Sequence, residues 1–323
     1  MQRCLVIKTS SLGDILQTLP VVLALKKQYP DRAIDWVVEK PFAPFLTHFT
    51  AIDCLIISDF KTWKKNPFKH GISILKFIKQ LQAKTYEMSL DFQGNFKSGL
   101  IQGFAKSKHK RGYTFKSAPE WPSALFSHKR FEGSLESSTQ FLFSLVKDLI
   151  AYPLDYTVEM RDIEPPSLTM REPWIVLGFG SAWPSKQLAM DQALDLIHSL
   201  KRDFQLPILV PVLSKEEKSY QSLTQGIEGV YLLVKKDFSS YIPYLQKTTL
   251  FVGVDSAFLH LARLLKVPSI GLFGPSSKSF YGLFSDLQGA CPYGQSFIKR
   301  CKRLRSCPAP CIKNLDLTQV KKD

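Results

Sequence analysis

The sequence contains no apolar run close to the ~20 residues that a helix needs to cross a bilayer. Its first apolar stretch runs only from Cys4 to Ile7 and ends at Lys8, which is too short for the core of a signal peptide. Hydrophobic residues nevertheless make up 45% of the chain and charged residues 22%, as in packed globular proteins. We therefore expect a folded cytoplasmic protein whose first buried strand begins at Cys4.

A Cys-x-x-Cys pair is also missing. Four of the six cysteines cluster near the C-terminus, but the gaps between them are nine, five and three residues. Zinc knuckles usually contain closely spaced cysteine pairs, so a metal site is the less favoured interpretation of this cluster. Without an export signal, the cysteines are expected to be reduced thiols.

Acidic residues are in short supply, because 28 Asp and Glu stand against 43 Lys and Arg, a formal net charge of +15. Such an excess attracts polyanions, which include nucleic acids, anionic membranes and phosphorylated substrates. The chain lacks zinc-finger and RRM signatures, which argues against a nucleic-acid partner. It also lacks a Gly-x-Gly-x-x-Gly turn after any expected strand, which argues against a dinucleotide-dependent dehydrogenase.

Apolar runs and amphipathic segments alternate in both halves of the chain, which predicts strands, helices and a mostly parallel sheet in each half. A charged stretch with two prolines, Pro165 and Pro166, separates the halves. We therefore predict an α/β protein with two doubly wound domains, residues 1–160 and 173–323, joined by a linker over 161–172. Strands are expected at 4–7, 33–38, 54–57, 86–91, 174–178, 208–210, 250–254 and 269–273, with helices at 15–28, 71–81, 191–200 and up to 265.

In such folds ligands bind at the carboxyl ends of the strands, where the connecting loops gather. The first polar loop there is Ser10-Ser11-Leu12-Gly13-Asp14, between a strand and a helix. Gly13 permits a tight turn beside a ligand. Asp14 has two interpretations of similar weight: it caps the helix, or it is a general base that faces a cleft.

The second polar loop follows the expected strand 250–254 and begins with Asp255-Ser256-Ala257. It leads into a helix, whose free backbone N–H groups and dipole favour a bound phosphate. The alternative is that Asp255 or Ser256 only caps this helix. His260 in the same helix is either part of the site or, as is commoner for a lone histidine on an apolar helix, structural.

The third polar loop runs from Gly178 to Lys186 after another expected strand. Its small residues and final lysine suit a phosphate clasp, in which Lys186 acts as a point charge. It is not a Walker loop, because the Gly-Lys-Ser/Thr ending is absent. A solvated surface lysine is the alternative, but three such loops after strands across two domains favour a phosphorylated ligand.

Two basic segments, Lys61–Lys65 and Lys106–Lys116, lie in the first predicted domain. Many such segments are solvated loops, but their shared domain indicates one patch for an anionic acceptor. Trp63, inside the first segment, either rests at a membrane interface or packs beneath a loop.

Together these motifs resemble the lipopolysaccharide heptosyltransferases of glycosyltransferase family 9, along nearly the whole chain. The stretches around Trp63 and Gln82–Tyr86 are most similar to the heptosyltransferase I branch. The motifs that carry the resemblance are Ser11-Leu12-Gly13-Asp14-Ile15 with Leu19-Pro20, Asp91-Phe92-Gln93-Gly94-Asn95-Phe96-Lys97-Ser98, Val254-Asp255-Ser256-Ala257 to His260-Leu261-Ala262, and Phe273-Gly274-Pro275.

The resemblance implies a GT-B fold, in which two Rossmann-like domains face a central cleft. It also implies an ADP-heptose donor and a Kdo–lipid A acceptor at the anionic inner face of the inner membrane. Inversion at the anomeric carbon would need no metal and no other cofactor. The residues implied are, for catalysis, Asp14 and Lys186; for the donor, Gly13, Ser181, Lys186, Glu217 with Glu216 as its near equal, Asp255, Ser256, Ala257 and His260; and for the acceptor, Lys61, Lys64 and Lys65.

Three positions depart from the family pattern. Ala257 stands where a glycine is common, and Pro119 stands where an acceptor-contacting arginine is usual. The loop after Pro211 lacks the usual Trp-Gly. These departures leave open two alternatives, heptosyltransferase II or a GT-B transferase that uses another nucleotide sugar or acceptor.

Overall fold

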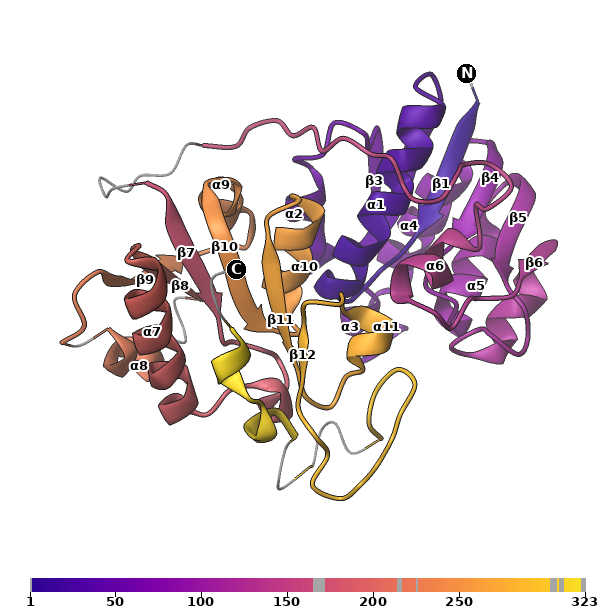
Figure 1. Cartoon of the computed structure of the whole chain (residues 1–323). Coiled ribbons are helices and arrows are strands. Elements are labelled where there is room, and N and C mark those ends of the chain that lie inside the picture. Colours follow the sequence, from indigo (N-terminus) through magenta and orange to yellow (C-terminus); the bar gives the residue numbers. More distant parts are fainter. Residues whose placement is uncertain are drawn as a thin grey trace. The chain divides into compact units, whose positions relative to one another are not determined.

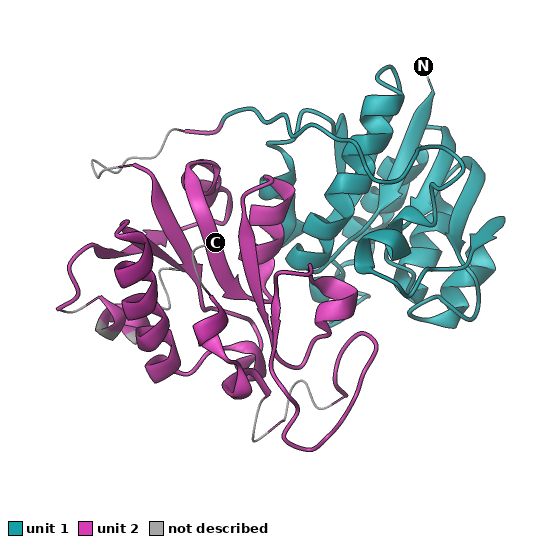
Figure 2. Cartoon of the chain, in the orientation of Figure 1, with its two compact units in different colours: residues 1–162 teal, residues 163–323 magenta. Residues whose placement is uncertain are grey.

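The computed structural model describes residues 2–164, 172–213, 217–224, 226–302, 307 and 311–320. The chain forms two compact units, residues 1–162 and residues 163–323 (Figure 2). Most of the predicted linker, residues 165–171, lies outside the described residues. Among the described helices, none combines the length and the apolar character of a membrane span.

Unit 1 contains a six-stranded, fully parallel sheet in the order β3-β2-β1-β4-β5-β6. Its strands are β1 (Arg3–Ile7), β2 (Ala33–Glu39), β3 (Cys54–Ser58), β4 (Tyr86–Asp91), β5 (Ser107–Tyr113) and β6 (Lys129–Phe131). Its helices are α1 (Leu12–Gln28), α2 (Ala43–Leu46), α3 (Phe60–Trp63), α4 (Gly71–Gln82), α5 (Phe96–Phe104) and α6 (Ser138–Phe143), with 3-10 turns η1 (Lys40–Phe42) and η2 (Trp121–Phe126).

Unit 2 repeats the arrangement with the order β12-β11-β10-β7-β8-β9 (Figure 1). Its strands are β7 (Trp174–Gly178), β8 (Ile208–Leu213), β9 (Val230–Lys235), β10 (Thr248–Val254), β11 (Ser269–Phe273) and β12 (Leu287–Gln288). Its helices are α7 (Met190–Phe204), α8 (Glu217–Tyr220), α9 (Ile242–Gln246), α10 (Ala257–Leu264) and α11 (Lys278–Tyr281), with 3-10 turns η3 (Pro184–Lys186), η5 (Gln221–Leu223), η6 (Ser239–Tyr241), η7 (Cys311–Asn314) and η8 (Leu317–Gln319).

Both sheets follow the doubly wound order 3-2-1-4-5-6, counted from the first strand of each unit. The order reverses between β1 and β4 in unit 1, and between β7 and β10 in unit 2. Because all strands are parallel, their carboxyl ends share one edge, and the loops after these two strands lie side by side. This is the switch point at which α/β sheets bind ligands. The prediction of two doubly wound α/β domains is confirmed.

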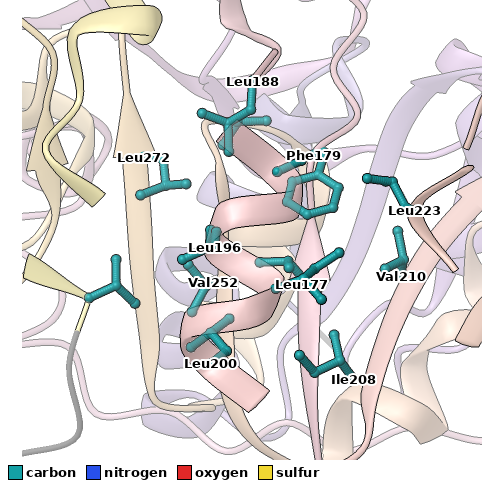
Figure 3. Packing of buried hydrophobic residues seen from close by; sticks show 14 of the residues in the cluster. Leu177, Phe179, Leu188, Leu196, Leu200, Ile208, Val210, Leu223, Val252 and Leu272 are labelled. Atoms are coloured by element: carbon teal, nitrogen blue, oxygen red, sulfur yellow. The ribbon is translucent and has the colours of Figure 1, made fainter. Parts of the chain in front are cut away.

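The core of unit 2 lies between the sheet and α7. Leu196 and Leu200 of α7 point onto the strands, where they pack with residues such as Leu177 and Val252 (Figure 3). Both leucines are at most 1% exposed. Full burial of such a side chain contributes about 1.5–3 kcal/mol, so this layer fixes the strands whose ends carry the site.

The sequence patterns missed four strands, β5, β6, β9 and β12. The basic segment Lys106–Lys116 was interpreted as part of an acceptor patch, but most of it is β5, a sheet strand. Arg111 in β5 is buried and forms two hydrogen bonds of 2.6 Å with Asp148, so its charge is neutralised inside the unit. Lys108 pairs with Glu87 at 2.9 Å. This segment therefore supplies structural contacts as well as surface charge.

Candidate active site

Asp14 lies in the first turn of α1, at the carboxyl end of β1. Its Oδ2 accepts hydrogen bonds of 2.9 Å from the backbone N–H and the hydroxyl of Ser11. Ser11 is the N-cap and Asp14 completes the capping box, so the interpretation of Asp14 itself as an N-cap is wrong by three residues. The tight turn predicted at Gly13 is also wrong, because Gly13 is already helical. Gly13 and Asp14 are both partly exposed, so the Asp14 carboxylate is fixed in place yet accessible.

Gln93, in the loop after β4, holds the loop that carries Asp14. Its Oε1 accepts from the backbone N–H of Thr9 at 3.1 Å and of Ser10 at 3.3 Å. The two loops come from the strands on either side of the switch point. The side-chain amide thus couples the loop after β4 to the start of α1. The sequence motif contained Gln93, but residue order alone does not show which backbone it reaches.

Asp91, the last residue of β4, shapes the Gln93 loop. Its Oδ1 accepts from the backbone N–H groups of Gln93 and Gly94 at 3.0 and 2.9 Å, and its Oδ2 accepts from the Ser98 hydroxyl at 2.9 Å. The side chain is 1% exposed. Burial raises the pKa of the Asp91 carboxyl to about 6, although these hydrogen bonds and the nearby Lys8 oppose the rise.

Pro119, which replaces an arginine of the family pattern, lies against the same loop. A Cβ at Gly94 would come within 2.7 Å of the Pro119 side chain, and Gly94 has a φ of +66°. The next residue, Glu120, donates its N–H to the Gly94 carbonyl and accepts from the Phe96 N–H. Position 119 is therefore near the switch point of unit 1, where it contributes packing and no charge.

The three predicted acceptor lysines lie beyond β3. Lys61 is in α3, and Lys64 and Lys65 follow it; all three side chains are exposed. Trp63 is 7% exposed and packs against the rings of Phe60 and Phe77 at 5.0 and 5.4 Å. Its interpretation as a membrane anchor is therefore wrong, and the packing alternative is confirmed.

In unit 2 the loops after β7 and β10 meet around one carboxylate. Lys186 Nζ donates to Asp255 Oδ2 at 2.5 Å, and His260 Nε2 lies 3.2 Å from Asp255 Oδ1. Ser276, in the loop after β11, also donates its hydroxyl to Asp255. Three predicted residues, Lys186, Asp255 and His260, are thus brought together, and the interpretation of Lys186 as a solvated surface lysine is wrong, since its side chain is only 15% exposed.

The Asp255 carboxyl is 7% exposed, so burial alone would raise its pKa. The His260 hydrogen bond and the positive charge of Lys186 outweigh burial and hold the pKa of this carboxyl well below its usual range. The side chain is therefore ionised throughout the physiological range. It holds a cation at the carboxyl edge of the sheet, close to the start of α10.

Ser256 is the N-cap of α10 by its extended backbone, but its hydroxyl makes no capping hydrogen bond. The buried Ser256 Oγ has no hydrogen-bond partner among the described residues. A buried polar atom without a partner costs about 1–3 kcal/mol, which a bound ligand can recover. Ala257 begins the helix, and the first backbone N–H groups of α10 have no partner within the helix. The hydroxyl, the helix start and Lys186 together suit a phosphate.

The remaining predicted donor residues lie in the same unit. Ser181, in the loop after β7, accepts from the Trp183 N–H with its hydroxyl and from the Gln187 side chain with its carbonyl. Glu217 begins α8 beyond β8 and is partly exposed. Glu216 lies outside the described residues. Within the described structure neither Ser181 nor Glu217 contacts Asp255, so their place in the site stays a prediction.

Ser276 is a site residue that the sequence patterns missed. It directly follows Phe273-Gly274-Pro275, where the quoted motif stopped. A serine just beyond a strand end was the available signal, but only the strand order shows that β11 lies next to β10. Among the described residues, no group of three His, Cys, Asp or Glu side chains is placed to hold a metal ion.

Comparison with known proteins agrees with this geometry. The model of glycosyltransferase family 9 (heptosyltransferase) matches residues 74–311. Lipopolysaccharide heptosyltransferase 1 of Pseudomonas aeruginosa is 26% identical over 298 residues, 88% of this chain and 82% of that protein. Lipopolysaccharide heptosyltransferase 3 of Escherichia coli K12 is 25% identical over 284 residues, 83% of this chain and 81% of that protein.

A solved structure extends the comparison to three dimensions. The E. coli heptosyltransferase WaaC with ADP-2-deoxy-2-fluoro heptose matches with a TM-score of 0.76 at 26% identity, and covers 91% of this chain and 95% of that chain. The two Rossmann-like units are therefore those of a GT-B fold, and the protein is a glycosyltransferase. The chain belongs to glycosyltransferase family 9, the heptosyltransferase family.

Proposed function

We propose that this enzyme transfers L-glycero-D-manno-heptose from ADP-heptose to the Kdo–lipid A inner core of lipopolysaccharide, with inversion at the anomeric carbon. The observation that carries the proposal is the Lys186–Asp255 pair beside the open start of α10. A nucleotide diphosphate needs cations and backbone donors at one place, and this arrangement supplies both. The heptosyltransferases to which the chain is similar support heptose as the sugar.

The donor would bind to unit 2. Its diphosphate would accept from the first N–H groups of α10 and from the Ser256 hydroxyl, which has no partner among the described residues. Lys186 is held by Asp255. The long, flexible side chain of Lys186 allows its ammonium to contact a phosphate oxygen while it stays close to the Asp255 carboxylate.

The base would come from unit 1. Asp14 takes the proton from an acceptor hydroxyl as that oxygen bonds to the anomeric carbon and the bond to the ADP oxygen breaks. Ser11 and Gln93 keep the carboxylate and its loop in place, so little reorganisation is needed during the reaction. A positioned base contributes about 10²–10⁴-fold, and charge stabilisation of the departing ADP supplies a further share.

The acceptor would be a phosphorylated lipid at an anionic membrane. The exposed Lys61, Lys64 and Lys65 support this choice, because the described structure gives them no ion pair that would neutralise them. They lie beyond the carboxyl end of β3, two strands from β1 and the loop that carries Asp14. No metal would take part.

The direct test supplies ADP-heptose with two acceptors, Kdo–lipid A and the same acceptor already carrying one heptose. We expect transfer to Kdo–lipid A. The anomeric configuration of the transferred heptose, read by NMR, should be opposite to that in the ADP-heptose donor. Transfer only to the heptose-bearing acceptor would show that the enzyme catalyses a later heptosyltransferase step. Transfer from another nucleotide sugar, tested in parallel, would show that the donor is different.

A further inference from the structure

Three large apolar side chains project into solvent from a short segment of unit 1. Phe68 is 98% exposed, Ile72 74% and Leu75 60%. Phe68 precedes α4, and Ile72 and Leu75 lie one turn apart within it. We call these three residues the apolar tip. Single exposed apolar residues are common, but three within eight positions, including a fully exposed phenylalanine, form an unusual cluster.

The two faces of α4 explain why the tip is not part of the core. Phe77 and Leu81 on the inner face are at most 6% exposed and pack with Trp63 in the core of unit 1. The spacing of Ile72 and Leu75 places them on the opposite face. The helix therefore carries apolar residues on both sides, although its buried residues, Phe77 and Leu81, lie on only one of them.

The segment that carries the apolar tip is rich in lysine. The segment 60–82 contains six lysines and no acidic residue. Within the described structure none of these lysines forms an ion pair, and each is exposed. They are Lys61, Lys64, Lys65, Lys69, Lys76 and Lys79. Uncompensated positive charge around exposed apolar side chains is the pattern of a surface that binds an anionic bilayer.

We propose that the apolar tip and its lysines dock unit 1 onto an anionic lipid bilayer. Phe68, Ile72 and Leu75 insert at the level of the headgroups and upper acyl chains, while the lysines contact lipid phosphates. A nucleic-acid partner fits less well, because Ile72 and Leu75 cannot stack on bases. An acidic protein would explain the lysines, but a bilayer accounts for both the charge and the fully exposed phenylalanine.

Only the biological role of this docking rests on the proposed function. The same segment carries the lysines proposed to contact the acceptor, so insertion of the tip would bring a lipid-anchored acceptor to them. The binding itself needs no acceptor and no donor. It can therefore be tested on vesicles that contain neither.

The experiment measures sedimentation of the full chain with vesicles of phosphatidylethanolamine and phosphatidylglycerol, and with vesicles of phosphatidylcholine alone. The test variant changes Phe68, Ile72 and Leu75 to serine. The matched control changes Phe284, Leu283 and Ile298, which are 100%, 52% and 62% exposed in unit 2, to serine. Both sets remove one Phe, one Leu and one Ile from the surface, and thermal unfolding checks that each variant is folded.

We expect the wild type and the control to bind anionic vesicles, and the test variant to bind at least ~10-fold more weakly. A second variant, with Lys69, Lys76 and Lys79 changed to Gln, should lose about fivefold per lysine and most of the salt dependence. In Phe68→Trp, the fluorescence should shift to the blue on anionic vesicles. Unchanged binding by the serine variant, equal loss in the control, or equal binding to phosphatidylcholine would each overturn the proposal.

Transfer to a deacylated, soluble acceptor separates this proposal from the proposed function. The serine variant should keep wild-type transfer to that acceptor and lose transfer only to vesicle-bound acceptor. If the wild type transfers heptose to neither acceptor, the proposed function fails while the vesicle result stands. If the variant loses transfer to both equally, the tip belongs to the acceptor site and the docking proposal is wrong.

Discussion

Replacement of Lys186 by Met removes the charge that neutralises Asp255 and keeps most of the side-chain stem. Removal of one partner from a buried ion pair costs about 3–5 kcal/mol, because the other charge stays buried. Asp255 keeps its hydrogen bonds with Ser276 and His260. We therefore expect the free energy of unfolding to fall by about 3 kcal/mol, at the lower end of that range.

The surface pair of Lys247 and Glu172 provides a matched control. Its atoms are 2.6 Å apart, close to the spacing in the Lys186 pair, but its side chains are 43% and 47% exposed. Exposed pairs contribute less than about 1 kcal/mol. Urea denaturation measures the free energy of unfolding of both variants. Lys247→Met should change it little, and the comparison separates the effect of burial from that of proximity.

The stability difference for Lys186→Met should also depend on pH. The pKa of Asp255 in the folded wild type lies below its unfolded value of 3.8, so the stabilisation is present above that pH and is lost as the pH falls further. Without Lys186 the pKa of Asp255 in the folded variant rises, so the gap between variant and wild type narrows as the pH falls through that raised pKa.

The kinetic consequence of Lys186→Met concerns the donor. Loss of a charge that stabilises the departing ADP should lower kcat/KM for ADP-heptose by about 10²–10³-fold, with little change in acceptor KM. A stability loss no larger than that of Lys247→Met, or an effect confined to acceptor KM, would refute the role given to Lys186.

Four further expectations follow from the same geometry. Asp14→Asn should fold with a stability change of about 1 kcal/mol or less, because the amide oxygen still accepts from the helix start. Heptose transfer should fall at least tenfold, and activity near wild type would make Asp14 only a capping residue. Because burial raises the pKa of Asp91 to about 6, wild-type stability should increase by up to about 3 kcal/mol relative to Asp91→Asn as the pH falls from 7 to 4. Parallel pH profiles of the two proteins in urea denaturation would contradict this expectation. Transfer should survive EDTA, since no Asp-x-Asp pair follows a candidate donor strand; loss that Mg²⁺ or Mn²⁺ restores would overturn the metal-free mechanism. Neutralising Lys61, Lys64 and Lys65 together should weaken use of the lipid acceptor and its salt dependence but spare ADP-heptose binding, measured by acceptor KM at several salt concentrations; an unchanged salt slope would mean that this run is only a solvated loop.

The sequence by itself determined three strands from their local pattern. β4, β7 and β11 begin and end at the predicted residues. β7 and β11 are mostly apolar, as expected of strands buried on both faces. In β4 apolar and polar residues alternate, which is the other strand pattern that local composition reveals. The polar loops after β1, β7 and β10 were predicted from the sequence because a change from apolar to polar residues marks a sheet edge.

Local pattern misled where a distant partner changes the environment. β5 contains charged residues, and it is a strand because it pairs with β4 and β6. Asp148, distant in the sequence, compensates the burial of Arg111 in this strand. The sequence left open whether Trp63 rests at a membrane interface or packs beneath a loop, and the structure shows its ring packed against Phe60 and Phe77. Ile72 and Leu75 are exposed instead, because the opposite face of α4 packs into the unit.

Only the tertiary structure decided which residues share a site. Lys186 and Asp255 are 69 residues apart and meet because β7 lies beside β10 at the switch point. Gln93 reaches the loop before Asp14 because β4 lies beside β1. Strand order is set by the packing of helices on both faces of each sheet, which is a property of the whole unit. The sequence therefore marked the polar side chains at the strand ends, and the folded sheets selected their partners, because a hydrogen bond or ion pair depends on distance in space.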